Sequence, residues 1–188
     1  MTTFIDSIRD EYLRYKTLGE AAIDQLSDDQ LSTRGPNGGN SIATICWHIS
    51  GNLKSRFTDF LTTDGEKPWR QREEEFEART VTRSELLSKW NEGWDVLLGT
   101  LSTLTDKQLT KTVTIRNQPL AVHEALHRSL AHLSYHVGQI VYAAKAMRGK
   151  DWKYLSIPPG GSAVYNQAPT SEKPAAHQAA LSKRSTRK

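Results

Sequence analysis

Hydrophobic residues recur every three or four positions along four long stretches of the chain, which is the spacing that places them on one face of an α-helix. These stretches cover about residues 2–26, 41–62, 82–104 and 120–147. Amphipathic helices of this length can bury their apolar faces only against one another. The pattern therefore predicts an all-α protein, and more specifically a four-helix bundle.

The ends of the predicted helices carry residues that are common at helix ends. Ser41 can cap the second helix, and the sequence Thr-Arg-Ser-Glu at residues 82–85 matches a capping box at the start of the third. Gly149 is placed to end the fourth helix. Between the third and fourth helices, residues 111–119 alternate polar and apolar positions, which indicates extended chain or a short hairpin.

The composition changes after residue 155. Residues 156–188 contain a Pro-Pro-Gly-Gly sequence followed by mainly small and polar residues with no apolar periodicity. Because such a segment buries too little apolar surface to offset its ordering entropy, we expect a flexible tail, at least from about residue 167. Residues 1–155 then form a single bundle domain.

The chain has a net charge of +4 at pH 7 and an isoelectric point near 9.2, which would suit a nucleic-acid partner. The excess positive charge is confined to the tail, whose basic residues stand against Glu172 alone: Lys173, Lys183, Arg184, Arg187 and Lys188. The rest of the chain is neutral, so nucleic acid is not an expected partner.

No stretch approaches the roughly 18 apolar residues of a membrane span, so a membrane partner is not expected either. The N-terminal residues lack the basic segment and apolar run of an export signal. The single cysteine, Cys46, cannot form an internal disulfide and is expected in the core, as are Trp90 and Trp94. Together these features predict a cytoplasmic protein.

Two pairs of histidines in the fourth predicted helix carry the strongest chemical signal. The pairs are His123 with His127 and His132 with His136, and a spacing of four residues places two imidazoles on one side of a helix, where they can share a metal ion. Each pair lies to one side of the apolar stripe, so periodicity alone does not choose between them. A third ligand must come from elsewhere, and His48 in the second helix is the candidate.

His48 belongs to a polar ridge beside the apolar face of the second helix. The ridge also contains Asn52, Ser55 and Asp59. Arg56 falls almost within the apolar stripe, where an arginine needs a buried or ligand-borne partner. Three interpretations stay open for these polar residues. They could form a solvated ridge, a structural network of ion pairs, or the polar lining of an approach to the metal.

The fourth predicted helix contains the motif H-x-x-x-H-x-G-Q-I over residues 132–140. With a histidine in the second helix, this arrangement resembles the DinB/YfiT-like superfamily of small bacterial four-helix-bundle proteins, over roughly residues 1–155. Residues 51–70 resemble one branch of it, whose members are grouped only as a domain of unknown function. Many relatives have a basic residue where this chain has Val137, a departure that concerns pocket lining more than metal ligation.

The resemblance implies that His48, His132 and His136 bind a divalent metal ion and that the other histidine pair does not. Nickel, zinc, iron and manganese are all candidates, because histidine ligands do not by themselves select among them. Gln139, one turn after His136, is expected to support that ligand by a hydrogen bond. Dimers are common in the superfamily, so we expect a homodimer, with the other pair on the surface or at the dimer face.

Three histidine ligands leave at least one coordination position for water or substrate, which is typical of a catalytic metal. Such a metal can activate water for hydrolysis or bind a thiol as thiolate. The resemblance favours the second chemistry, because characterised relatives include transferases and isomerases that use bacillithiol or mycothiol. We therefore predict a thiol-dependent transferase whose partners are a small-molecule thiol and an electrophile, with Asn52 and Arg56 orienting the co-substrate.

Two alternatives remain open at this point. One is a metal-dependent hydrolase, and the other is a non-catalytic metal-binding or stress-response protein in which the ion joins the second and fourth helices. The charge run at residues 70–75, Arg-Gln-Arg-Glu-Glu-Glu, is expected to be a solvated loop or the start of a helix.

Overall fold

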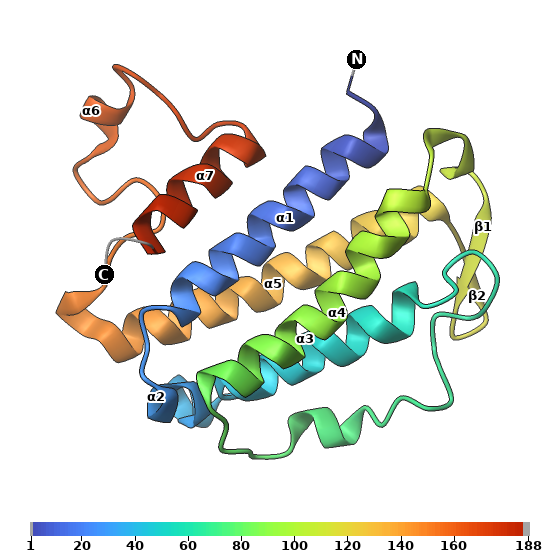
Figure 1. Cartoon of the computed structure of the whole chain (residues 1–188), viewed down its shortest axis with the longest axis horizontal. Coiled ribbons are helices and arrows are strands. Elements are labelled where there is room, and N and C mark those ends of the chain that lie inside the picture. Colours follow the sequence, from blue (N-terminus) through green and yellow to red (C-terminus); the bar gives the residue numbers. More distant parts are fainter. Residues whose placement is uncertain (1, 186–188) are drawn as a thin grey trace.

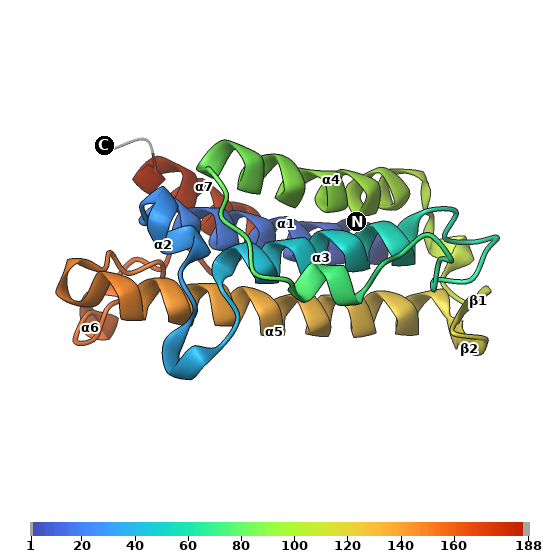
Figure 2. The ribbon, with the colours of Figure 1, turned by 90° about the horizontal axis from the view of Figure 1, so that it is seen from below.

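The computed structural model describes residues 2–185 and is mostly helical. Four long helices lie alongside one another in both views (Figures 1 and 2): α1 (Phe4–Ile23), α3 (Ile42–Phe57), α4 (Arg83–Thr103) and α5 (Val122–Arg148). The shorter elements are α2 (Asp28–Ser32), β1 (Thr112–Ile115), β2 (Gln118–Ala121), α6 (Ser162–Tyr165), α7 (Pro174–Ser185) and the 3₁₀ turns η1 (Pro36–Gly38), η2 (Glu73–Phe76), η3 (Asp106–Gln108) and η4 (Gly149–Asp151). The prediction of an all-α protein is thus confirmed in its main part, with one two-stranded sheet added.

The four long helices enclose one apolar core, to which each contributes completely or almost completely buried side chains. Trp90 and Trp94 of α4 are both fully buried, with ring centroids 5.3 Å apart, and Cys46 of α3 is buried as well. The contact between α3 and α4 is especially close at Gly93, where a Cβ atom would lie 2.6 Å from the Cα of Ser50. A larger residue at that position would push the two helices apart.

Residues at the helix ends determine where the long helices begin and end. The hydroxyl of Thr82 accepts from the amide of Glu85, and the Glu85 carboxylate accepts from the amide of Thr82 at 2.8 Å, which is the predicted capping box of α4. The second long helix was expected to reach about residue 62 but ends at Phe57. It ends there because Thr58 is extended and Asp59 has a positive φ of 50°.

Strands β1 and β2 form the hairpin that the alternation at residues 111–119 indicated as one option. Arg116 and Asn117 make the two-residue turn, and both have positive φ, as a type I′ turn requires. The carboxylate of Asp64 accepts the amide protons of both turn residues at 2.8 Å. Asp64 therefore fastens the hairpin to the loop that follows α3.

Within the C-terminal segment that the sequence predicts to be flexible, residues Pro174–Ser185 form α7, which packs against α1 (Figure 1). Leu181 is only 1% exposed, and the side-chain amide of Gln178 donates to the carbonyl of Asp10 at 3.1 Å. A single large apolar residue among alanines gives no stripe in the sequence, so periodicity could not reveal this helix. Of the basic residues in the tail, Arg187 and Lys188 lie outside the described residues.

Among residues 2–185, none of the helices combines the length and the apolar character needed to cross a lipid bilayer.

Candidate metal centre

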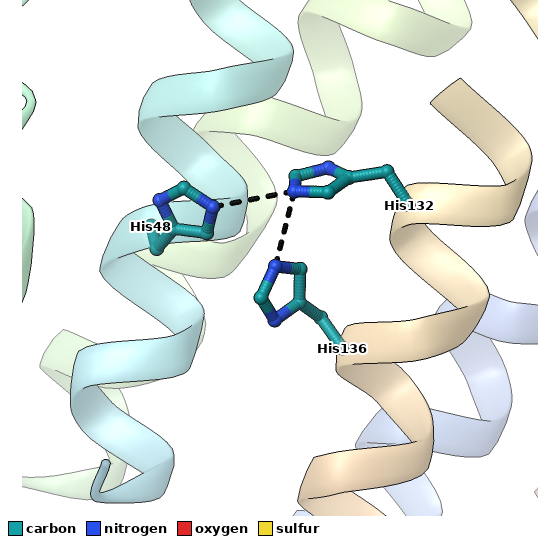
Figure 3. A group of neighbouring side chains, drawn as sticks. All are labelled: His48, His132 and His136. Atoms are coloured by element: carbon teal, nitrogen blue, oxygen red, sulfur yellow. Dashed lines mark hydrogen bonds between the residues drawn. The ribbon is translucent and has the colours of Figure 1, made fainter. Parts of the chain in front are cut away.

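Three histidines from two helices meet between α3 and α5 (Figure 3). The Nε2 atom of His132 lies 3.3 Å from that of His48 and 3.0 Å from that of His136. One ligand nitrogen from each ring lies within 4.8 Å of the other two, and no other such group of histidine, cysteine or carboxylate ligands occurs in residues 2–185. Nitrogens bound at about 2.0–2.1 Å to a tetrahedral ion lie about 3.4 Å apart. The distances from His132 to His48 and to His136 are therefore already close to those of a three-nitrogen metal site.

The surroundings of His132 and His136 favour the neutral imidazole, which is the form that binds metals. Burial, together with the neighbouring rings of His136 and His48, lowers the pKa of His132 to about 4. Burial also lowers the pKa of His136, against the opposing effect of its hydrogen bond with Gln139. At neutral pH the nitrogen lone pairs of these two rings are therefore available to an ion.

Hydrogen bonds at the far side of two of the rings turn their Nε2 atoms toward the centre of the cluster. The Nδ1 atom of His136 donates to Oε1 of Gln139, one turn further along α5, at 2.8 Å. The Nδ1 atom of His48 donates to Oε2 of Glu75 at 2.9 Å. Such bonds fix the tautomer and orientation of a metal-binding histidine, and a carboxylate partner also makes the ring a better donor.

Glu75 is the residue that the sequence analysis missed. The run at residues 70–75 was expected to be solvated, but the Glu75 side chain is only 9% exposed and that of Arg70 only 2%. Arg70 donates through Nε and Nη2 to the two carboxylate oxygens at 2.8 and 2.9 Å. The segment between α3 and α4 folds back along α3 (Figure 2), which a local charge pattern cannot reveal.

A glycine in the interior of α3 was the available signal for this contact. A Cβ atom at Gly51 would lie 2.0 Å from Oε1 of Glu75. Glycine in the middle of a helix costs stability, so its presence often marks a close approach of another group. Here it leaves room for the carboxylate that binds His48.

A cavity of about 220 Å³ lies beside the cluster and includes His48 and His132 in its walls. Asn52 and Arg56, two residues expected to line an approach to the metal, both contribute to this wall. Arg56 also donates to Oε2 of Glu66 at 3.2 Å and to the carbonyl of Gly65. Burial lowers the pKa of Arg56, although Glu66 opposes the shift.

The remaining polar residues of the sequence hypothesis lie elsewhere. Asp59 is exposed in the loop after α3 and does not line this cavity. His123 forms a hydrogen bond with the carbonyl of Leu109 at 2.9 Å through its Nδ1 atom, and His127 packs edge-on against Phe4 with ring centroids 5.5 Å apart. The structure therefore brings only one of the two histidine pairs of α5 to His48, and this is the pair that the motif favoured.

These observations define a mostly helical protein with a partly buried three-histidine group that could hold a metal ion. The chain belongs to the family described as "Protein of unknown function (DUF1572)", whose model matches residues 1–161. The match includes the three histidines, Arg70 and Glu75, and it ends before α6. No curated protein and no solved structure matches the chain.

Proposed function

We propose that this protein binds one divalent metal ion through the Nε2 atoms of His48, His132 and His136 and uses it to act on a small molecule. The observation that carries the proposal is the convergence of three imidazole nitrogens within 4.8 Å of one another. Two of the rings are oriented by hydrogen bonds from the opposite ring nitrogen. The arrangement of four long helices around one core supports our assignment of the chain to the DinB/YfiT-like four-helix-bundle type.

An open coordination position supports a catalytic role rather than a purely structural one. Within residues 2–185 no fourth histidine, cysteine or carboxylate joins the group. The Glu75 carboxylate is engaged by His48 and Arg70, and burial raises the pKa of the Cys46 thiol, which keeps it protonated. A structural zinc site would normally be closed by a fourth protein ligand.

For the reaction, we propose transfer of a low-molecular-weight thiol to an electrophile. A bound divalent ion would favour the thiolate form of such a thiol. The sulfur would form a bond to an electrophilic carbon, while the thiol proton and the leaving group depart to solvent. Glu75 would hold the His48 ring by accepting its Nδ1 proton, and Asn52 and Arg56 would orient the co-substrate in the cavity. Hydrolysis is the alternative use of the same open position.

Elemental analysis of the purified protein tests the metal site. The wild-type protein is expected to contain about one divalent ion per chain, and the triple variant His48→Ala, His132→Ala, His136→Ala is expected to contain none. His127→Ala is the matched control, because it removes a histidine from the same helix outside the cluster. Equal metal content in the triple variant and the wild type would contradict the site.

Two further measurements test the kind of function. A screen of thiol and electrophile pairs with metal-loaded protein is expected to show thiol consumption that His132→Ala abolishes. Removal of the ion with a chelator is expected to leave the fold intact by circular dichroism. A structural ion would behave differently, since its binding energy is folding energy and its loss would unfold the chain.

A further inference from the structure

The cavity beside the histidine cluster has an unusual wall. Five of its lining residues are arginines, and none is acidic. They come from α3, the loop after it, the hairpin turn and α5, in the order Arg56, Arg70, Arg72, Arg116 and Arg128. We call these five residues the arginine wall.

The carboxylates around the arginine wall do not balance its charge. Glu66 is shared, accepting from Arg56 at 3.2 Å and from Arg116 at 2.8 Å. Glu75 pairs with Arg70, as described, and the exposed Glu73 pairs with Arg72. Three carboxylates thus face five guanidinium groups, and two positive charges remain uncompensated.

Arg128 is the least compensated member of the wall. Among the residues that the structure describes, it has no ion pair and no hydrogen bond, although it lines the cavity from α5 one turn before His132. Like charges gathered around a cavity repel one another, and a bound anion relieves that repulsion. Guanidinium groups also present paired N–H donors that match carboxylate and phosphate oxygens.

We propose that the arginine wall is an anion subsite, which binds the carboxylate or phosphate groups of the small molecule that reaches the metal. The inference rests on the proposed function for the identity of this molecule as the ligand of the metal site. Two uncompensated charges match a dianionic ligand, such as a dicarboxylate or a phosphate monoester. The subsite and the histidines His48 and His132 line the same cavity of about 220 Å³, so one small molecule can contact both.

Isothermal titration calorimetry on chelator-treated protein tests the subsite apart from the metal. The probes are inorganic phosphate, succinate and the uncharged succinamide. We expect phosphate or succinate to bind, succinamide not to bind, and Arg128→Gln to weaken anion binding about tenfold through loss of a charged hydrogen bond. Comparison of the two anions shows which acid group the subsite prefers. Arg128→Lys is expected to retain part of the affinity, since it keeps the charge but loses the paired donors.

Arg34→Gln is the matched control, because Arg34 is exposed in the loop before α3 and does not line the cavity. Equal anion affinity in Arg128→Gln and Arg34→Gln would overturn the subsite. Binding of anions only to metal-loaded protein would also overturn the subsite, since the anion would then be bound by the metal and not by the arginines. If the protein binds metal but no anion, the subsite is overturned and the proposed function is not. If the protein binds anions but takes up no metal, the proposed function is overturned and the subsite is not.

Discussion

At the scale of single residues, Glu75 links a buried ion pair to the candidate metal site. Burial alone would raise the pKa of its carboxyl group, but the hydrogen bonds from His48 and Arg70 outweigh burial and lower the pKa below its ordinary value. The group is therefore ionised and can only accept hydrogen bonds. This leaves the proton of His48 on Nδ1 and the lone pair on Nε2, where the ion would bind.

The variant Glu75→Gln tests this positioning role. We expect it to weaken metal binding by roughly 10–100-fold, because a neutral amide cannot support the His48 ring as a carboxylate does. The affinity can be measured by competition with a chromogenic chelator, alongside thermal unfolding. Glu74→Gln is the control from the same charge run, since Glu74 is exposed. A metal affinity equal to that of the wild type would show that Glu75 serves the fold alone.

The variant Gly51→Ala separates helix propensity from the approach of Glu75. Alanine in a helix interior is favoured over glycine by about 1 kcal/mol, so propensity alone predicts a more stable protein. The added Cβ atom would, however, displace the Glu75 carboxylate. We expect a lower metal affinity in the same chelator competition. Gly99→Ala in α4 is the control, because a Cβ atom there meets nothing within 4 Å. Unchanged affinity in Gly51→Ala would mean that the carboxylate is not held at this place.

At the scale of elements, the hairpin depends on Asp64 for its attachment. The amides of Glu66, Asn117 and Arg116 donate to the Asp64 carboxylate and lower its pKa, while burial opposes the shift slightly. Because the hairpin turn supplies Arg116 and β1 supplies Ile115 to the cavity wall, this attachment also shapes the candidate site. The contribution of Asp64 to stability should therefore depend on pH.

A folded-state pKa below the unfolded value means that the ionised carboxylate stabilises the fold. This stability is fully present above the unfolded pKa near 4 and is lost as the pH falls below it. We expect Asp64→Asn to be less stable than the wild type at neutral pH, and the difference to shrink as the pH is lowered to about 3. Urea unfolding across this range measures the effect. Asp95→Asn, at an exposed position of α4, is the control variant. A stability difference that stays constant across this pH range would contradict the role of Asp64.

The four long helices could be predicted because each carries its own local signals. The capping box at Thr82 and Glu85 and the three- to four-residue repeat of α4 are properties of one continuous segment. The fold-back of the segment between α3 and α4 depends on contacts with distant residues. The sequence pattern therefore placed Glu75, the carboxylate that binds His48, in a solvated run of charged residues. The histidine pair of α5 is an intermediate case, since its spacing is local but the choice between two pairs needed the following Gly-Gln-Ile.

At the scale of the whole molecule, α7 adds a layer to α1 beyond the part of the chain that the family model matches. The family match ends at residue 161, and α7 begins at Pro174. Its main apolar anchor is Leu181, since the other residues of the helix are small or polar. A helix held by one large apolar side chain and a few side-chain hydrogen bonds should open locally while the rest of the fold stays intact.

The variant Leu181→Ala is expected to release α7 from α1. We expect faster hydrogen exchange in residues 174–185 and a modest loss of global stability, below the roughly 2–5 kcal/mol typical of a leucine truncated in a core. Metal content is expected to stay unchanged, because the histidine cluster lies between other helices. Val164→Ala is the control, since Val164 is 74% exposed. Exchange that is unchanged in α7 would show that further contacts hold this helix.

The expected homodimer stays a prediction. Tyr135 and Tyr142 of α5 are 62% and 66% exposed. Sedimentation of a variant with serine at both positions would test whether this exposed side of α5 forms the dimer contact.

The three histidines come from two helices, α3 and α5, which lie far apart in the sequence. His48 and His132 are separated by 84 positions in the chain, so an ion held between them would close a long loop that contains all of α4 and the hairpin. Such a loop restricts the unfolded chain in the way that a disulfide does, but reversibly. Unfolding would then require release of the ion, and the free energy of unfolding would rise with the logarithm of the free metal concentration. The melting temperature of this protein would in that case report the metal supply of its surroundings as well as the packing of its core.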